Sequence, residues 1–132
     1  KKFDTVIIGG GIGGLMAAYR LHKNCPQMTI AITERGNELE KRNCPAGKNS
    51  TCVHCNICSI TSGFAGAGAF SDGKFNLGTA YGGTLGEELG DDVANLYIDE
   101  VDKILNEYCT SGVPQVFKSN DELLNVTFLE NN

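Results

Sequence analysis

The sequence predicts an α/β fold, and three observations within its first 34 residues support this prediction. A short apolar run at residues 5–8 is followed at once by a glycine cluster at residues 9–14. A segment with helical spacing comes next, and a second apolar run at residues 29–33 ends in Glu34. Strand, glycine turn, helix and strand in this order are typical of a βαβ unit with two parallel strands.

The glycine cluster contains the pattern Gly-x-Gly-x-x-Gly at positions 9, 11 and 14. Gly9 allows a sharp turn after the strand, Gly11 leaves room for a pyrophosphate, and Gly14 lets the helix pack closely on the sheet. The first turn of the helix presents unpaired N–H groups to the phosphates. Glu34, twenty-five positions after Gly9, is near the usual offset of the acid that binds a ribose. The pattern therefore predicts a Rossmann-like, dinucleotide-binding unit, and the ribose acid suits NAD and FAD equally.

Each element of this unit has a local reason. The continuous apolar run at the end of residues 1–8 predicts a strand that is buried on both faces, as in a parallel sheet. A helix is expected over residues 13–23, with Leu15, Ala18 and Leu21 facing inward. It should end before Pro26, because the residue preceding a proline disfavours the helical conformation.

The remainder of the chain is predicted as three segments. Residues 37–90 form a loop rich in cysteine and glycine, without a regular element between residues 63 and 90. Residues 91–109 form a helix that starts at two aspartates, and residues 110–132 contain partial strands at 113–118 and 126–129. The two strands of the βαβ unit do not complete a doubly wound sheet. We therefore expect the 132 residues to be the N-terminal part of a longer three-layer ββα domain, with residues 1–36 as its βαβ unit.

The composition excludes several classes of function. The net charge of −5 argues against a nucleic-acid-binding surface, which needs clustered lysine and arginine. No stretch is long and apolar enough to cross a membrane, and the first residues do not form a signal peptide. We expect a soluble protein whose partners are a small-molecule redox substrate or an electron carrier.

A second glycine cluster carries a more specific signal. The stretch Phe64-Ala65-Gly66-Ala67-Gly68-Ala69-Phe70-Ser71-Asp72-Gly73-Lys74 follows the first cluster and the Glu34-Arg35-Gly36 turn. In this order, the residues resemble the FAD-dependent dehydrogenases of the glutathione-reductase-like flavoprotein superfamily, over roughly the first 110 residues. One departure is Ala65, where the family pattern has glycine.

The resemblance implies FAD as the cofactor, with the later glycine cluster returning to the same cofactor as the first. It places the adenine next to Arg35 and the ribityl or pyrophosphate side next to the second glycine cluster. Small residues there permit donation from the backbone N–H groups, and the hydroxyl of Ser71 can donate as well. The predicted cofactor-binding residues are Gly9, Gly11, Ile12, Gly13, Gly14, Glu34, Arg35, Gly66, Ala67, Gly68 and Ser71. No catalytic residue is assigned, because in flavoenzymes the isoalloxazine performs the redox step.

A cysteine run between the two glycine clusters suggests a metal. Cys52, Cys55 and Cys58 have the spacing that ferredoxin-type sequences use for iron–sulfur clusters, and Cys44 could supply a fourth thiolate. Structural zinc on the same four residues and free or redox-active thiols are the alternatives. Reduced or metal-bound thiols in a dinucleotide fold are typical of an intracellular protein, so we expect a cytoplasmic location.

These observations favour the FAD-binding portion of an oxidoreductase that passes hydride from NAD(P)H or a substrate to its flavin. Two alternatives stay open at this point. The first is an NAD-binding dehydrogenase without flavin. The second is an interaction module that is organised by zinc or an iron–sulfur cluster.

Overall fold

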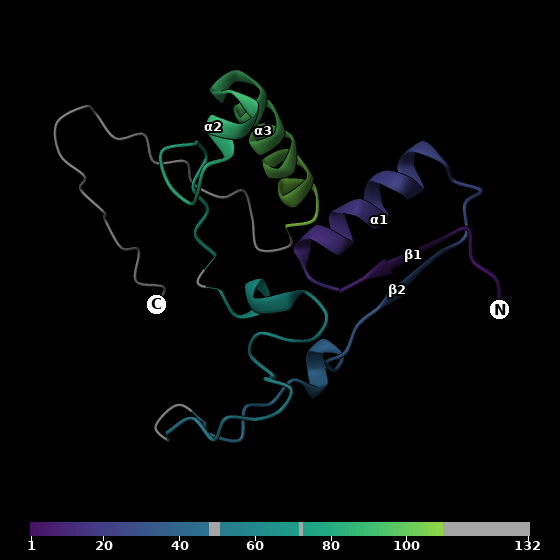
Figure 1. Ribbon diagram of the computed structural model, residues 1–132, viewed down its shortest axis with the longest axis vertical. Coiled ribbons are helices and arrows are strands. Elements are labelled where there is room, and N and C mark those ends of the chain that lie inside the picture. The colour runs from purple at the N-terminus through teal and green to yellow at the C-terminus, as the bar shows by residue number, and fades with distance from the viewer. Residues whose placement is uncertain (48–50, 72, 110–132) are drawn as a thin grey trace, which may run out of the picture. The chain divides into compact units, whose positions relative to one another are not determined.

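The computed structural model describes residues 1–47, 51–71 and 73–109, and the chain divides into two units (Figure 1). Unit 1 comprises Lys1–Lys74 and unit 2 comprises Phe75–Asn132. The partial strands that the sequence predicts within residues 110–132 lie outside the described residues.

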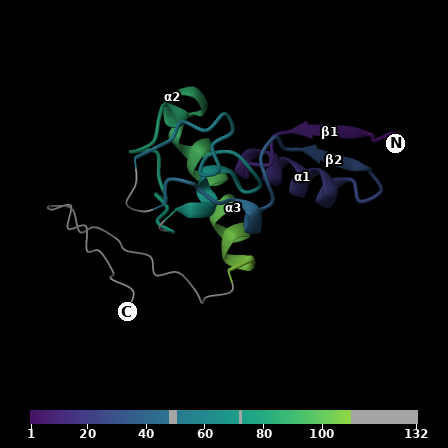
Figure 2. The ribbon, with the colours of Figure 1, turned by 90° about the horizontal axis from the view of Figure 1, so that it is seen from below.

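Unit 1 is built around a parallel βαβ arrangement. The elements are β1 (Thr5–Ile8), α1 (Ile12–Asn24) and β2 (Ile30–Thr33). The two strands pair in parallel, with Thr5 opposite Ile30 and Ile8 opposite Thr33, and α1 packs against both of them. Figures 1 and 2 both show the strands side by side with α1 alongside. The α/β architecture and the bounds of the first helix agree with the sequence predictions to within one residue.

Helix α1 presents the face that its sequence predicts. Leu15, Ala18 and Leu21 are half-buried, whereas His22 and Lys23 are exposed. The two basic side chains lie in the last turn, where a positive charge is favourable beside the carbonyl end of a helix.

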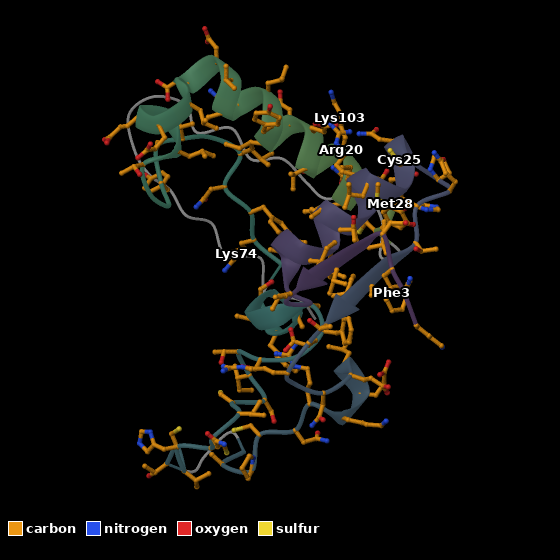
Figure 3. The ribbon with its side chains drawn as sticks, turned by 45° about the vertical axis from the view of Figure 1, so that its right-hand side comes forward. Phe3, Arg20, Cys25, Met28, Lys74 and Lys103 are labelled. Carbon is orange, nitrogen blue, oxygen red and sulfur yellow. The ribbon has the colours of Figure 1, made fainter. Side chains whose placement is uncertain are left out.

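The amino ends of the two strands are joined by a side-chain contact. The carboxylate of Asp4 accepts hydrogen bonds from the amide and the hydroxyl of Thr29, at 2.8 and 2.7 Å. These bonds lower the pKa of Asp4 below its usual 3.8. Next to them, the Thr5 hydroxyl lies 3.3 Å from the Met28 sulfur, and Figure 3 shows Met28 at this end of the unit. The first glycine cluster lies at the opposite, carboxyl end of the strands.

The prediction that β1 is buried on both faces is wrong for the described residues. Val6 is 54% exposed and Ile8 is 91% exposed. Successive side chains of a strand point to opposite faces, and α1 covers only the face of Thr5 and Ile7. The apolar run is therefore covered on one face only in the part of the chain that the structure describes.

The irregular loop predicted over residues 37–90 contains short helical segments and crosses the boundary between the units. Two 3₁₀ turns occur in unit 1, at η1 (Leu39–Lys41) and η2 (Gly66–Phe70), and the short helix α2 (Leu85–Leu89) occurs in unit 2. The prediction of no regular element between residues 63 and 90 is thus wrong. Two of the glycines lie at the ends of these segments and do not prevent them from forming. Gly66 starts η2 at φ +60°, and Gly90 ends α2 at φ +81°.

Within residues 75–109, unit 2 contains α2 and the longer helix α3 (Asp91–Glu107), which pack against each other. Helix α3 starts at the two aspartates, as predicted, and its Ala94 is completely buried. The Thr79 hydroxyl donates to Asp91 at 2.7 Å, which fixes the preceding loop on the start of the helix. None of the helices in the described residues has the length and apolar character needed to span a membrane.

Candidate dinucleotide site

A hollow of about 550 Å³ lies in unit 1 at the carboxyl ends of β1 and β2. Ligand pockets in proteins usually have volumes of about 300–1,000 Å³. Open α/β sheets bind their ligands at this edge, outside the carboxyl ends of the strands. The lining residues are Ile8, Gly9, Gly11, Thr33, Glu34, Arg35, Thr61, Ser62, Gly63 and Gly66.

The glycines at positions 9, 11 and 14 form the dinucleotide fingerprint, and two of them, Gly9 and Gly14, are required by the backbone conformation and the packing of the protein itself. Gly9 has φ +104°, a conformation that side chains rarely adopt. Gly14 lies in the first turns of α1, and a Cβ atom there would overlap the carbonyl oxygen of Gly9 and crowd Ile7. The close helix–sheet packing predicted for Gly14 is therefore present.

Gly11 is different, because neither its conformation nor its protein neighbours require glycine. Its φ of −73° is ordinary, and a Cβ atom would meet nothing closer than the Cα of Gly66, at 3.9 Å. That distance is an ordinary van der Waals contact between the first glycine loop (residues 9–14) and the second glycine loop (residues 61–71), and both loops line the hollow. A side chain is thus absent at the position where a pyrophosphate would need the room.

Glu34 stands at the rim of the hollow and binds three backbone amides. One carboxylate oxygen, Oε2, accepts from the Gly10 amide at 2.7 Å. The other, Oε1, accepts from the amides of Gly36 and Gly63 at 2.8 and 3.0 Å. The hydrogen bond from Gly10, followed by that from Gly36, holds the pKa of Glu34 below its usual 4.5. The ionised carboxylate therefore connects the fingerprint loop to the two later loops.

The second glycine cluster lies against the first. The amide of Ala65 donates to the carbonyl oxygen of Gly10 at 2.9 Å. A Cβ atom at Gly10 would come within 2.9 Å of the Phe64 ring. Ala65 itself has φ +67°, a left-handed conformation that glycine adopts more readily than alanine.

Arg35 contacts the same loop through its side chain. Its Nε and Nη2 atoms lie 3.3 and 2.9 Å from the Ser62 hydroxyl oxygen. Ser62 is buried and its neighbour Thr61 is exposed, and both line the hollow. The planar guanidinium of Arg35 is therefore held at the wall of the hollow.

The structure gathers five of the eleven predicted cofactor residues around the hollow. These are Gly9, Gly11, Glu34, Arg35 and Gly66. Ile12, Gly13 and Gly14 belong to the first turn of α1, whereas Ala67 and Gly68 belong to η2 and Ser71 directly follows it. Whether these residues contact a cofactor stays a prediction.

Sequence reasoning missed the lining residues Ile8, Thr33, Thr61, Ser62 and Gly63. The first two are the last residues of their strands, so the rule about the carboxyl ends of strands could have identified them. The other three immediately precede the second glycine cluster and have no separate sequence signal.

The cysteine run is not assembled into a metal site in the described residues. Cys44, Cys52 and Cys55 are exposed, Cys58 is half-buried, and all are free thiols. No group of three or more cysteine, histidine, aspartate or glutamate residues is close enough to hold a metal ion within residues 1–47, 51–71 and 73–109. The metal site on these four cysteines therefore stays a prediction.

Cys58 precedes the lining residue Thr61 by three positions, and the pKa of its thiol is lowered. The hydroxyl of Thr61 and then the amides of Thr61 and Ile60 stabilise the thiolate, so its pKa falls below the usual 9.0. Arg42 adds a smaller effect in the same direction.

Comparison with known proteins agrees with this geometry. A family model described as an NAD(P)-binding Rossmann-like domain matches residues 7–66. The mitochondrial L-2-hydroxyglutarate dehydrogenase of Nematostella vectensis is 38% identical over 57 residues, which is 43% of this chain and 12% of the relative. The enzyme of the same name from Caenorhabditis elegans is 39% identical over 56 residues, which is 42% of this chain and 12% of the relative. No solved structure matches the chain.

The chain thus has a Rossmann-like fold, and its matched part spans about an eighth of the curated relatives. The matching residues 7–66 contain both glycine loops up to Gly66, together with Glu34. The part of the chain that resembles known nucleotide-binding domains is therefore the part that encloses the hollow.

Proposed function

We propose that the hollow in unit 1 binds FAD and that the protein is a flavin-dependent oxidoreductase. The observation that carries this proposal is the hollow of about 550 Å³ at the carboxyl ends of two parallel strands, with Gly11 and Gly66 in its lining. An acid that can bind a ribose, Glu34, stands beside that space.

The residues of this chain would bind the two halves of the dinucleotide differently. The amides at the start of α1 would donate to the diphosphate, and Gly11 would allow it to approach the backbone. The Oε2 atom of Glu34, which accepts from the Gly10 amide, would also accept from a ribose hydroxyl, because a carboxylate oxygen accepts about two hydrogen bonds. Arg35 would lie beside the adenine, where its guanidinium can stack.

The second glycine loop is what favours FAD over NAD in this proposal. It adds Thr61, Ser62, Gly63 and Gly66 to the wall, so the hollow is enclosed by two loops and not by the fingerprint alone. Bound FAD would supply two-electron redox chemistry, in which hydride arrives from NAD(P)H or from a reduced small molecule. The electron acceptor stays undefined.

The relatives support the class of reaction. They are named dehydrogenases of L-2-hydroxyglutarate, so oxidation or reduction of a small molecule is the chemistry we propose for the whole protein. Their names also place them in mitochondria, whereas the sequence favours the cytoplasm for this protein. We keep the cytoplasmic location as a proposal that fractionation would decide.

An NAD(P)-dependent dehydrogenase without flavin is the second candidate. The description of the matching family model, an NAD(P)-binding Rossmann-like domain, favours it. Glu34 would then bind the adenosine ribose of NAD in the same way. The two candidates differ in the ligand and not in the position of the site.

A valine at Gly11 tests the proposed site. Gly11→Val adds a side chain to the lining of the hollow, where its Cβ atom would meet no protein atom closer than the Gly66 Cα, at 3.9 Å. We therefore expect the full-length apoprotein to fold but to bind FAD at least about tenfold more weakly. Gly78→Val is the matched control, because a Cβ atom at Gly78 meets no neighbour within 4 Å and Gly78 does not line the hollow. Quenching of flavin fluorescence during titration measures the affinity. Equal affinity in the wild type and Gly11→Val would refute the site, and tight binding of NAD with no binding of FAD would favour the second candidate.

A further inference from the structure

Arg42 is a buried arginine whose role no sequence pattern indicates. Only 4% of it is exposed. Its guanidinium donates four hydrogen bonds, and each of them ends on a backbone carbonyl oxygen and not on a carboxylate. The acceptors are Ser59 at 2.9 Å, Ile60 at 2.7 Å, Phe64 at 2.6 Å and Gly66 at 2.8 Å.

These four carbonyl groups belong to the segment of residues 59–66, which leads into the second glycine cluster. This segment contains no strand, so its carbonyl groups lack the partners that a sheet would provide. Arg42 supplies partners from a single side chain. It also stacks on the Phe70 ring, with its central carbon 4.7 Å from the ring centroid. One residue therefore contacts both the start and the end of η2.

Arg42 lies directly behind the wall of the hollow. Gly63 and Gly66 line the hollow, and Arg42 contacts both of them. A Cβ atom at Gly63 would come within 2.6 Å of Cδ of Arg42. On their other side, the amides of Gly63 and Ala65 donate to Glu34 and to the Gly10 carbonyl oxygen. The loop is thus held between Arg42 and the fingerprint region.

We propose that Arg42 is a positioning residue, which fixes the second glycine loop at the distance from the fingerprint loop that a dinucleotide diphosphate requires. This inference rests on the proposed function. Four acceptors arranged around one planar fork suit a guanidinium, whereas the three N–H groups of lysine diverge from one atom. Geometry, and not charge alone, is therefore the property that the loop needs.

Substitutions in the full-length protein separate geometry from charge. Arg42→Lys keeps the charge but loses the fork, and Arg42→Gln loses both. Lys41→Gln is the matched control, because it removes the neighbouring charge from an exposed side chain that pairs with Glu38 at 3.0 Å. We expect both Arg42 variants to bind FAD at least about tenfold more weakly than the wild type, and Lys41→Gln to stay within about twofold.

Hydrogen exchange of the apoproteins provides a readout that does not depend on flavin. Mass spectrometry of Arg42→Lys should show faster exchange in peptides that cover residues 59–71 and unchanged exchange in residues 5–9 of β1. A purely structural role would instead accelerate exchange in both segments.

The outcomes distinguish the two proposals. If the wild type binds FAD and Arg42→Lys binds it equally well, or if exchange rises equally in both segments, Arg42 is not a positioning residue. A wild type that binds no FAD overturns the proposed function. In that case unchanged exchange over residues 59–71 would also overturn the positioning role, and selective acceleration there would support it.

Discussion

Glu34 is the residue on which the hollow depends most, because its one carboxylate connects several segments of the fold and would also bind the ribose of the proposed ligand. Its three amide partners come from Gly10, Gly36 and Gly63, which belong to three separate segments of unit 1. Amide donors stabilise the ionised form, so the protonated form would leave these donors less well satisfied. The geometry of the hollow therefore depends on the charge of its acid.

The lowered pKa of Glu34 predicts a loss of stability in acid. Because the folded-state pKa lies below the usual 4.5, the ionised carboxylate contributes stability fully above that value. This contribution is lost as the pH falls from 4.5 through the folded-state pKa. We expect urea unfolding of Glu34→Gln to be less dependent on pH in this range than unfolding of the wild type. Glu38→Gln, at an exposed side chain, is the control, and parallel pH profiles for the wild type and Glu34→Gln would contradict the prediction.

Ala65 offers a test of backbone strain in the second loop. Its φ of +67° costs an alanine about 1 kcal/mol relative to glycine. Ala65→Gly gains flexibility in the unfolded chain, which offsets about 0.4–1 kcal/mol of this, so we expect stability to stay equal or to rise by up to about 0.6 kcal/mol. Ala67→Gly, two residues later in η2 and without a positive φ, should lower it by about 0.5–1 kcal/mol. Equal losses in the two variants, measured by urea unfolding, would count against the left-handed conformation.

At the residue scale, the sequence predicted those site residues whose role follows from local spacing. Gly9, Gly11 and Glu34 could be found because a turn, a phosphate and a ribose impose fixed offsets along a βαβ unit. Arg42 and Ser62 could not be found, since their partners lie 17–27 positions away and no periodicity connects them.

At the scale of elements, the contact between α1 and the strands determines where the fingerprint loop lies. Gly14 approaches the Gly9 carbonyl oxygen so closely that any side chain must push the helix away from the sheet. Gly13, one residue earlier, has no neighbour within 4 Å of a Cβ atom. Of these two adjacent glycines in one helix, Gly14 therefore has no room for a side chain and Gly13 has room.

This pair makes a matched prediction about stability. Gly14→Ala should lower the free energy of unfolding by about 1–3 kcal/mol, because it overpacks the contact. Gly13→Ala should raise it by up to about 1 kcal/mol, because alanine favours a helix more than glycine does. Urea unfolding of the full-length protein measures both. A Gly14→Ala variant as stable as Gly13→Ala would contradict the close contact.

The elements that the sequence predicted are those with a strong local pattern. Helices α1 and α3 have helical spacing over 13 and 17 residues, and both were predicted with nearly the observed bounds. The short segments α2 and η2 have five residues each, too few for a periodicity, and they contain glycine. The exposure of Val6 and Ile8 depends on which elements cover the sheet, and a single strand carries no information about that.

At the scale of the whole molecule, the hollow belongs entirely to unit 1, since all of its lining residues lie between positions 8 and 66. A ligand that binds only the folded state stabilises that state by mass action. Binding of FAD should therefore protect the protein from thermal unfolding.

The expected size of this effect is about 2.7 kcal/mol when free FAD is a hundredfold above its dissociation constant. Differential scanning calorimetry of the full-length apoprotein, with and without FAD, measures the shift in melting temperature. Gly78→Val should show the same shift as the wild type, and Gly11→Val should show about half of it or less at the same concentration, because tenfold weaker binding reduces the stabilisation to about 1.4 kcal/mol. A shift of equal size in Gly11→Val would mean that FAD binds elsewhere.

The visible absorption spectrum of the intact, natively purified protein tests the central claim most directly. The account predicts the absorption bands of an oxidised flavin, with about one FAD per chain released on denaturation and the bands greatly reduced in Gly11→Val. A colourless wild-type protein, from which NAD and no flavin is recovered, would contradict it.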